Sequence, residues 1–354
     1  MGDTMELQEI FVHENMTVKE ALKKLDETAK KILLVTKGNK LLGIVTDGDI
    51  RRWILKNGDL TEPISKVMNK SPKFVYEKDV VLAKQIMKEE MIEAIPVLNN
   101  SDEVIDIIFW NDRFKSKFKK HKKINNPVVI MAGGKGTRLE PYTKILPKPL
   151  IPIGNTPIVE RIIDRFHEFG CNQFYLTVNY KKNMIKAYFN ELEKNYTVEF
   201  VEEEKPLGTG GSLHLLKDRI KETFFVSNCD ILIDGDYTDM IEYHKKHNNK
   251  ITLITSLRHY TVPYGIVKID NESKVVEIVE KPEYDYLVNT GMYVLEPECL
   301  NDIPENTFYH ITELINKYIE KGERVGVYPV TENSWLDMGQ FEEMEHMKEV
   351  LGVE

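Results

Sequence analysis

The chain has 354 residues, of which 42% are hydrophobic and 30% are charged, as in ordinary globular proteins. This length suits two or three domains, each large enough for its own core. A formal net charge of -9 argues against a broad nucleic-acid surface, because phosphate neutralisation requires clustered lysine and arginine. No apolar run approaches the ~18 residues of a membrane span, and the first residues are acidic where a signal peptide would be basic. We therefore expect a cytoplasmic protein.

Cysteine and histidine spacing gives no sign of a zinc site or a disulfide framework. Cys171, Cys229 and Cys299 lie far apart with no C-x-x-C pattern. The nine histidines are scattered without H-E-x-x-H, so they are interpreted as surface or packing residues. His310 is expected to start a helix.

The first third of the chain contains an imperfect internal repeat. Its first unit predicts a helix ending near Thr28, strands over 32–35 and 41–46 around a Gly-Asn turn, and a second helix from about Asp49. The second unit predicts a helix over 82–90 and strands over 94–98 and 104–109 around an Asn-Asn-Ser-Asp turn. Both units follow the order strand, helix, strand, strand, helix.

This repeat, with LLGIVTDGDIRR closing its first unit, resembles a tandem pair of CBS domains, which usually bind adenosine nucleotides. By that resemblance the pair spans 1–122, with repeats at about 8–56 and 64–120. Thr46 and Asp49 match a T-x-x-D pattern whose hydroxyl contacts phosphate and whose carboxylate accepts from the ribose hydroxyls. The second repeat has Phe109 in place of the hydroxyl, so one ligand site for an adenosine or guanosine nucleotide is expected.

Two alternatives remain open for this region. The pair could serve only for dimerisation, since an aspartate at a helix start is also a good cap. The basic run over 113–123 could touch a nucleotide or nucleic acid, although a solvated linker helix is the favoured interpretation. A linker is expected over 123–126, and Pro127 begins a new domain.

The new domain opens with an apolar run, typical of a buried parallel strand, followed by a glycine-rich loop. A strand, a loop and a helix in this order suit a nucleotide site. The loop matches neither G-x-G-x-x-G nor a Walker A sequence, which argues against hydride transfer and P-loop ATPase chemistry. Its backbone N–H groups could wrap a triphosphate, and Arg138 and Lys148 add positive charge.

The whole string G-G-x-G-T-R-L-x-P-x-T-x-x-x-P-K-P-L-x-P-I, beginning at Gly133, is a specific signal. With it, residues 127–354 resemble a sugar-1-phosphate nucleotidyltransferase, which implies a Rossmann-like α/β domain with a mixed sheet beside the smaller α/β CBS domain. The resemblance continues through EEEKPLGTGGSL (202–213), VSNCD, YGIV, VEKP, VNTGMYVLEP and WLDMG. Cys229 departs from the pattern, which more usually has glycine there.

The resemblance also implies roles for individual residues. Asp230 and Asp337 would hold Mg²⁺, Lys281 would meet the sugar phosphate, Arg138 the leaving pyrophosphate and Lys148 the α-phosphate. The nucleotide would lie against Ala132, Gly133, Gly134, Gly136, Thr137, Glu203 and Gly208. The sugar pocket would contain Gly265, Glu280 and Asn289.

The acidic run over 202–204 bears on the choice of base. A carboxylate accepts both the N1–H and the 2-amino group of guanine, whereas pyrimidine carbonyls would be repelled. This favours GTP as the nucleotide, with Glu203 rather than Glu204 as the preferred candidate for the contact with the base. The alternative is an acidic strand end that faces solvent.

Together these observations predict transfer of GMP from GTP to a sugar 1-phosphate, releasing pyrophosphate. Glucosamine 1-phosphate is the expected sugar, because the layout is closest to the CBS-fused glucosamine-1-phosphate guanylyltransferases of legionaminic acid synthesis. Mannose- or heptose-1-phosphate guanylyltransferases and a cytidylyltransferase are the enzymatic alternatives, and an inactive nucleotide sensor is the alternative from another class. No hexapeptide-repeat tail follows Gly339, which argues against a bifunctional acetyltransferase. A homo-oligomer that binds no nucleic acid or membrane is expected.

Overall fold

The computed structural model describes residues 7–353 except 29, 84–85, 88–89, 91, 93 and 110–122. Its contacts divide the chain into two compact units. The first unit contains Met1–Lys119, Ser256–Val288 and Pro329–Asn333. The second unit contains Lys120–Thr255, Asn289–Tyr328 and Ser334–Glu354.

The first repeat forms the three-stranded sheet β1-β2-β3 with two helices. The helix α1 buries Val18, Ala21, Leu22 and Leu25, whose spacing places them on one helical face. The elements are β1 (Phe11–Val12), α1 (Val18–Thr28), β2 (Ile32–Lys37), β3 (Lys40–Thr46) and α2 (Asp47–Leu55), with short 3-10 helices at Leu7–Ile10 and Ile64–Lys66. The helix and strands expected for this repeat are confirmed.

The second repeat forms the sheet β4-β5-β6, from β4 (Val75–Tyr76), β5 (Ala94–Leu98) and β6 (Val104–Phe109). A 3-10 helix, Glu77–Leu82, precedes the expected helix, of which the structure describes only some residues. The two repeats meet at their hairpin turns, where the Val104 N–H donates to the Asn39 carbonyl at 2.8 Å. Most of the basic run over 113–123 lies outside the described residues.

The chain after residue 127 forms a seven-stranded mixed sheet, in the order β11-β10-β7-β12-β17-β14-β18. The first four of these strands are parallel, and β17 pairs with β12 in the antiparallel sense. The strands are β7 (Val128–Met131), β10 (Gln173–Val178), β11 (Thr197–Glu202), β12 (Phe224–Asn228), β14 (Ile251–Thr261), β17 (Glu283–Leu295) and β18 (Val325–Val330). This is the mixed α/β architecture expected from the sequence.

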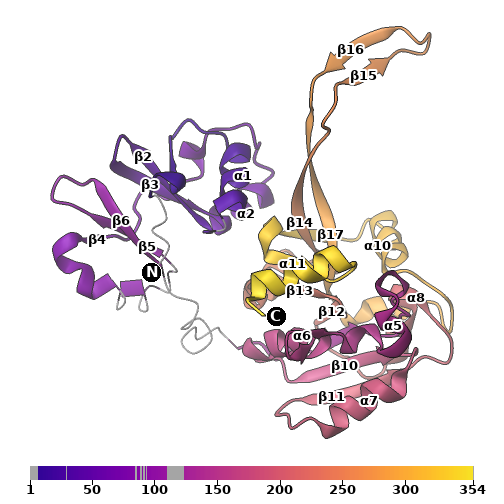
Figure 1. The fold of residues 1–354 in the computed structure, drawn as a ribbon. Coiled ribbons are helices and arrows are strands. Elements are labelled where there is room, and N and C mark those ends of the chain that lie inside the picture. The colour runs from indigo at the N-terminus through magenta and orange to yellow at the C-terminus, as the bar shows by residue number, and fades with distance from the viewer. Residues whose placement is uncertain are drawn as a thin grey trace. The chain divides into compact units, whose positions relative to one another are not determined.

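Helices cover the faces of this sheet (Figure 1). They are α6 (Ile158–Glu168), α7 (Lys182–Glu191), α9 (Tyr237–Lys246), α10 (Ile311–Glu320) and α11 (Phe341–Leu351), with the short α5 (Tyr142–Ile145) and α8 (Gly208–Gly211). An aromatic cluster joins α6 and α9 to β12: the Phe166 ring lies 5.1 Å from that of Phe225 and 4.6 Å from that of Tyr237. No helix in the described part of the chain is long and apolar enough to cross a membrane.

Three small two-stranded sheets complete the fold. They are β8 (Pro152–Ile153) with β9 (Thr156–Pro157), β13 (Ile231–Ile233) with β19 (Trp335–Asp337), and β15 (Ile266–Ile269) with β16 (Val275–Val279). The β15–β16 hairpin lies between β14 and β17 in the chain (Figure 1) and belongs to the first unit. Its Lys268–Glu277 ion pair links the two strands across the hairpin.

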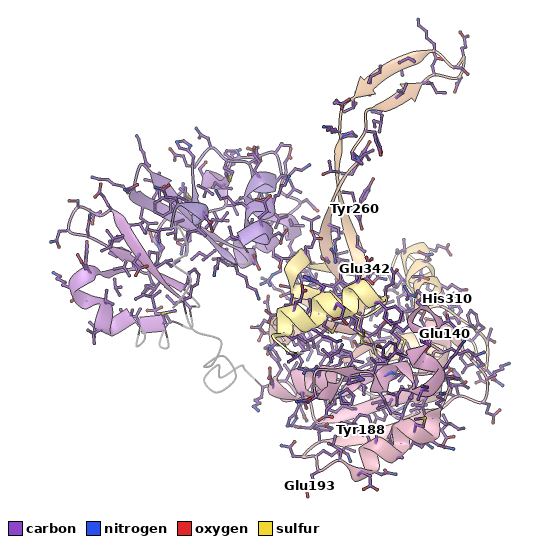
Figure 2. The ribbon with its side chains drawn as sticks, viewed as in Figure 1. Glu140, Tyr188, Glu193, Tyr260, His310 and Glu342 are labelled. Atoms are coloured by element: carbon purple, nitrogen blue, oxygen red, sulfur yellow. The ribbon has the colours of Figure 1, made fainter. Side chains whose placement is uncertain are left out.

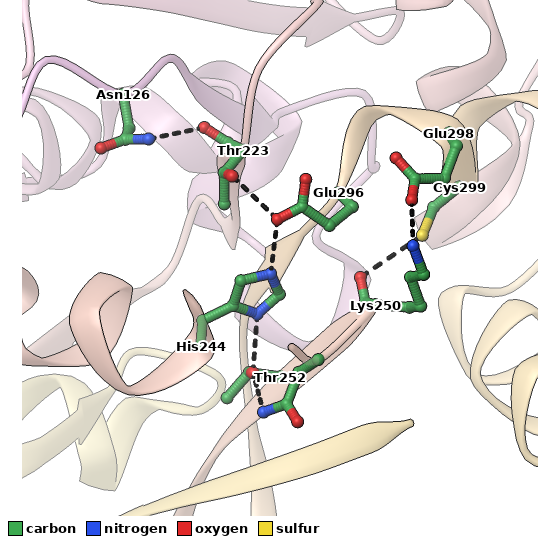
Figure 3. Close-up of polar contacts among 9 residues, drawn as sticks. Asn126, Thr223, His244, Lys250, Thr252, Glu296, Glu298 and Cys299 are labelled. Atoms are coloured by element: carbon green, nitrogen blue, oxygen red, sulfur yellow. Dashed lines mark hydrogen bonds and ion pairs between the residues drawn. The ribbon is translucent and has the colours of Figure 1, made fainter. Parts of the chain in front are cut away.

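A buried polar network lies at the amino-terminal end of β12 (Figure 3). The His244 side chain is fully buried and is hydrogen-bonded to Thr252 at 2.8 Å and to Glu296 at 3.1 Å. Glu296 also accepts from the Thr223 hydroxyl at 2.8 Å, and the Thr223 carbonyl accepts from the amide of Asn126 at 2.7 Å. The network therefore fixes the expected linker, which ends at Asn126, to the second unit.

Candidate functional site

The site lies at the carboxyl end of β7, where the strand order reverses. The chain passes from β7 to β10 and β11 on one side, and β12 then lies on the other side of β7. Ligands of open α/β sheets bind at such a switch point. The Ala132 N–H donates to the Thr177 carbonyl at 2.9 Å and so fixes the start of the glycine-rich loop.

Two glycines of this loop are required by close approaches. Gly136 has a φ of +67°, and a Cβ there would lie 3.0 Å from the Lys148 side chain. A Cβ on Gly133 would lie 2.6 Å from the Glu203 carboxylate. Between them, Gly134 faces open space, so a phosphate could approach the backbone directly.

Polar groups after the loop hold it in place and line its rim. Thr137 and Arg138 are exposed on the 3-10 helix Thr137–Leu139. The Thr143 hydroxyl donates to the Gly136 carbonyl at 3.0 Å. The loop is therefore anchored while Arg138 stays accessible to a ligand.

Lys148 and Asp230 form a buried ion pair beside the loop. Their exposed fractions are only 8% and 9%. Lys148 lies in the 3-10 helix Lys148–Leu150, flanked by prolines that fix its backbone. The positive charge expected for an α-phosphate is thus held next to the carboxylate expected for a metal.

The structure brings Asp337 next to Asp230. In the antiparallel pair β13–β19, Ile231 is opposite Asp337, and the Met338 N–H donates to the Asp230 carbonyl at 2.8 Å. Burial, followed by the charge of Asp230, raises the pKa of Asp337 to about 6, against the opposing effects of Lys148 and Arg138. Lys148, Arg138 and Asp230 therefore lie close enough to Asp337 for their charges to act on it, whereas Lys281 belongs to the first unit.

This donor set fits Mg²⁺. Asp230 and Asp337 are adjacent carboxylates, and burial together with the charge of Asp230 disfavours the ionised form of Asp337. A bound cation would offset this effect. No group of three or more His, Cys, Asp or Glu side chains suited to a metal occurs among the described residues. A magnesium site takes one or two carboxylates and completes its shell with water and substrate phosphates, and Asp230 and Asp337 supply such a pair.

The three glutamates at 202–204, of which Glu202 ends β11, have different environments. Glu203 is only 5% exposed, and its carboxylate accepts the Leu207 N–H at 3.1 Å. Burial raises the pKa of Glu203, and the hydroxyls of Thr177 and Ser212 partly oppose the shift. Glu202 is exposed and pairs with lysines of α7, and Glu204 is also exposed. Glu203 is therefore not the solvent-facing strand end that the sequence left open.

Gly208 begins a tight segment that packs against residues 307–311. The N–H groups of Gly210 and Gly211 donate to the Tyr309 carbonyl at 2.9 and 3.0 Å. His310, labelled in Figure 2, precedes α10 and forms a capping box with Glu313, so the helix start expected there is confirmed. These contacts fix the shape of the segment that follows Glu203.

The residues expected in the sugar pocket fall into two groups. Asn289 is exposed in the second unit, and its side chain accepts the Gly291 N–H at 3.1 Å beside Asn228, the last residue of β12. Gly265, Glu280 and Lys281 lie on the β15–β16 hairpin of the first unit. A Cβ on Gly265 would be 2.8 Å from the Glu280 carboxylate, so these two are neighbours. Their assignment to the sugar rests on the sequence resemblance.

Thr46 and Asp49 form the capping box of α2. The Thr46 hydroxyl donates to Asp49 at 2.6 Å, and Asp49 also pairs with Arg52 at 2.6 Å. The sequence alternative had Asp49 as the cap, whereas the structure makes Thr46 the N-cap and places Asp49 at the third helical position. A ligand role for the same two residues stays a prediction.

Sequence reasoning did not single out two polar residues of the site. The Asn179 amide donates to the Glu203 carbonyl at 2.8 Å, and Glu343 lies close enough to raise the pKa of Asp337. Asn179 directly follows β10, and a polar residue after a parallel strand is a signal that could have identified it. Glu343 is one of several acidic residues in α11, so no pattern distinguishes it.

Comparisons with known proteins agree with this geometry. The family model described as Nucleotidyl transferase matches residues 127–351, and the CBS domain model matches residues 2–56. The Probable mannose-1-phosphate guanylyltransferase 1 of Oryza sativa subsp. japonica is 31% identical over 222 residues, which are 60% of this chain and 61% of that protein. The Bifunctional protein GlmU of Methanococcus maripaludis is 33% identical over 220 residues, 60% of this chain and 51% of that protein. The chain thus spans 51% to 61% of the length of these relatives.

A solved structure shows the same fold. The crystal structure of HddC from Yersinia pseudotuberculosis has a TM-score of 0.51 and 27% identity, covering 64% of this chain and 99% of that chain. HddC has also been solved in complex with GMP-PN. Because this family model matches residues 127–351, more than half of the chain, the chain belongs to the nucleotidyl transferase family.

Proposed function

We propose that this chain transfers GMP from GTP to a sugar 1-phosphate and releases pyrophosphate. The observation that carries the proposal is the convergence of Lys148, Asp230 and Asp337 beside an open glycine-rich loop. Two polyanions must meet for this reaction, and the site combines buried positive charge with a magnesium-type carboxylate pair.

The chemistry needs no general base. An oxygen of the sugar phosphate, already anionic, attacks the α-phosphorus in line, and the bond from that phosphorus to the bridging oxygen breaks as pyrophosphate leaves. Lys148 neutralises the α-phosphate and Arg138, exposed at the loop rim, holds the leaving pyrophosphate. Mg²⁺ bound by Asp230 and Asp337 would supply further charge neutralisation on the phosphates.

Glu203 supports guanine as the base. One of its carboxylate oxygens accepts the Leu207 N–H, and the other lies against Gly133 in the loop, where the nucleotide is expected. Hydrogen bonds to a charged group contribute about 1.5 to 3 kcal/mol each, enough for at least a tenfold preference. The mannose-1-phosphate guanylyltransferases among the relatives and the GMP-PN complex of HddC are consistent with this choice.

For the sugar, we propose glucosamine 1-phosphate, with mannose 1-phosphate as the alternative favoured by the curated relatives. Asn289, Gly265 and Glu280 would contact its hydroxyls, and Lys281 its phosphate. Lys281 has a φ of +44°, a strained conformation for a lysine. Such strain is frequent at ligand-binding positions.

For the CBS region, we propose one adenosine or guanosine nucleotide bound at Thr46 and Asp49, in a cytoplasmic homo-oligomer. One carboxylate oxygen of Asp49 accepts the N–H and hydroxyl of Thr46, and the other pairs with the exposed side chain of Arg52, which a ribose would have to displace. Isothermal titration calorimetry of the full chain with AMP, ADP and ATP should show a site that Asp49→Ala weakens. If Asp49→Ala changes the heat with none of these nucleotides, dimerisation remains as the function of the pair.

The test of the reaction is a matrix of GTP, CTP, UTP and dTTP against glucosamine, mannose and heptose 1-phosphates with Mg²⁺, scored by pyrophosphate release. We expect GTP to exceed UTP and dTTP in kcat/KM by at least about tenfold, and Glu203→Gln to narrow that gap. Equal or better turnover with UTP or dTTP would contradict the base assignment. Nucleotide binding without turnover for any pair would favour the inactive sensor.

A further inference from the structure

We infer that Glu343 is a positioning residue of the magnesium site, where its carboxylate orients water molecules in the shell of the metal. This inference rests on the proposed function and names a third carboxylate at the same site. The residues that carry it, from Asp337 to Glu343 together with Asp230, all belong to the second unit.

The start of α11 lies next to the Asp337 carboxylate. Three residues separate Asp337, at the end of β19, from the first residue of the helix. A Cβ on Gly339 would lie 3.1 Å from the Asp337 carboxylate, so this group is turned towards the backbone that enters α11. Burial and then the charge of Asp230 raise the pKa of Asp337, and Glu343 in the first turn of α11 adds to the shift. The carboxyl groups of Glu343 and Asp337 are therefore close.

Glu343 occupies the third position of its helix, where an acidic side chain often closes a capping box. At the same position of α2 and α10, Asp49 and Glu313 accept the backbone N–H of the N-cap residue at 2.9 and 2.8 Å. No capping box forms in α11 between Gln340 and Glu343, both of which the structure describes. Instead, the side-chain amide of Gln340 lies 3.4 Å from Oε1 of Glu343, which is long for a hydrogen bond. The Glu343 carboxylate is thus not used to cap its own helix.

The second carboxylate oxygen of Glu343 is buried without a partner. Its Oε2 atom has no hydrogen bond to any group within the described ranges of the chain. Such an atom is rare in folded proteins, because burial removes the water that would otherwise donate to it. Water held by a cation at Asp230 and Asp337 would supply the missing donor.

Carboxylates outnumber cations among the charges at this place. Asp337 has Asp230 and Glu343 as acidic neighbours, whereas Lys148 and Arg138 oppose their effect. The proposed function assigns both of these cations to phosphates of the substrates. Once the cations bind phosphate, a metal ion is needed to neutralise the carboxylates that remain.

Glu343 acts through water rather than as a direct ligand. No cluster of three His, Cys, Asp or Glu side chains that could coordinate a metal is present in the part of the chain that the structure describes. Mg²⁺ keeps several of its water molecules when carboxylates bind it. Groups that orient the ligands of a metal in this way typically contribute about 10- to 100-fold to its affinity.

The test uses the full chain without nucleotide and titrates it with Mn²⁺, whose unbound fraction is measured by electron paramagnetic resonance. The key variant is Glu343→Gln, which keeps the side-chain shape and removes the charge. Glu342→Gln is the matched control, because it removes the same charge from the adjacent, exposed position of the same helix turn. Asp337→Asn identifies binding at the magnesium site. Melting temperatures are measured for each variant with and without Mg²⁺.

We expect Glu343→Gln to raise the Kd for Mn²⁺ by about 10- to 100-fold, and Glu342→Gln to change it little. Without metal, Glu343→Gln should not lower the melting temperature, whereas the loss of a helix cap would lower it. With Mg²⁺, its gain in melting temperature should be smaller than that of the control.

Three results would overturn the inference: equal Kd values in the two glutamate variants, a melting temperature of Glu343→Gln that falls without metal while the Kd is unchanged, or no Mn²⁺ binding that Asp337→Asn weakens. Turnover of GTP with a sugar 1-phosphate alongside any of these results would leave the proposed function standing. Conversely, weaker Mn²⁺ binding by Glu343→Gln in a chain that turns over no substrate pair would support the inference and reject the proposed function.

Discussion

The Lys148 ammonium group pairs with the carboxylate of Asp230, so the group expected to bind substrate phosphate already neutralises a group expected to bind metal. Both side chains are buried, and Asp337 adds a second carboxylate whose pKa is raised by the first. Asp230 and Asp337 would hold the metal, which would neutralise their charge and release the Lys148 ammonium group to bind the substrate phosphate. The ion pair thus keeps the site neutralised before substrate binds.

The first prediction concerns Lys148→Ala. Loss of one preorganised cation at a charged transition state should lower turnover by about 10²- to 10³-fold. Because Asp230 then loses its partner while buried, the melting temperature without metal should fall, and added Mg²⁺ should restore more of it than in the wild type. Lys144→Ala is the control, since Lys144 is exposed and pairs only loosely with Glu140 at 3.3 Å. Turnover of the Lys148 variant close to that of the control would remove this residue from the mechanism.

The second prediction separates the two aspartates. Asp230→Asn and Asp337→Asn should both abolish Mg²⁺-dependent pyrophosphate release, because an amide cannot supply the anionic oxygen. Without metal, Asp230→Asn should lower the melting temperature by breaking the pair with Lys148. Asp337→Asn should leave the melting temperature unchanged or raise it, because burial already disfavours the ionised form of the Asp337 carboxyl group. Melting curves that shift equally in both variants would contradict this distinction, and Asp218→Asn, at an exposed position, serves as control.

Much of this site could be predicted from the sequence because its signal is local. The glycine-rich string and Lys148 lie within one short segment, and their close packing around Gly136 agrees with that order. The meeting of Asp230 and Asp337 follows from the β13–β19 pairing, a contact between distant segments that only the family resemblance anticipated. Composition and periodicity carry no information on such a pairing.

Other features lie beyond what a single sequence specifies. The sequence does not distinguish the three consecutive glutamates at 202–204. Only the fold buries Glu203 against Gly133 while its two neighbours stay exposed. The Asp47–Thr331 bond joins segments from opposite ends of the chain, with no motif at Thr331. His244 illustrates the same limit, because its burial depends on Glu296 and Thr252 from other elements.

The third prediction concerns pH and the network around His244. The hydrogen bond from His244 is the main cause that lowers the pKa of Glu296 from its usual 4.5, and Thr223 adds to it. The folded-state pKa lies below the unfolded value, so the stabilisation is present above pH 4.5 and is lost as pH falls through the folded pKa. Glu296→Gln should therefore cost about 1 to 3 kcal/mol near neutral pH.

That cost should shrink as urea unfolding is measured at progressively lower pH. Glu298→Gln is the control, because Glu298 pairs with Lys250 at the surface and should change stability little at any pH. A Glu296→Gln difference that stays constant from pH 7 to well below 4.5 would show that the charge of Glu296 contributes nothing to the network.

The last prediction concerns Asp26 in α1. Burial raises its pKa from 3.8 to about 7, and the charges of Glu332 and Asp47 add to the shift while Arg258 opposes it. The folded state therefore binds the proton more tightly than the unfolded state. The stabilisation from protonated Asp26 is complete below pH 3.8 and is lost as pH rises towards 7. Asp26→Asn, which resembles the protonated form, should be more stable than the wild type above pH 7, by about 1 to 2 kcal/mol once partial solvent screening is allowed for.

Urea unfolding of the full chain at several pH values measures this difference. The stability advantage of Asp26→Asn should vanish as pH falls towards 4. The wild-type Asp26 carboxyl group is then protonated and, like the asparagine amide, carries no charge beside Glu332, Asp47 and Arg258. Glu9→Gln is the control, since Glu9 is exposed and is not among the charges that shift the pKa of Asp26, so it should show no such pH dependence. If Asp26→Asn is no more stable than the wild type at pH 8, or gains equally at pH 4 and pH 8, then the charge of Asp26 does not destabilise the folded chain.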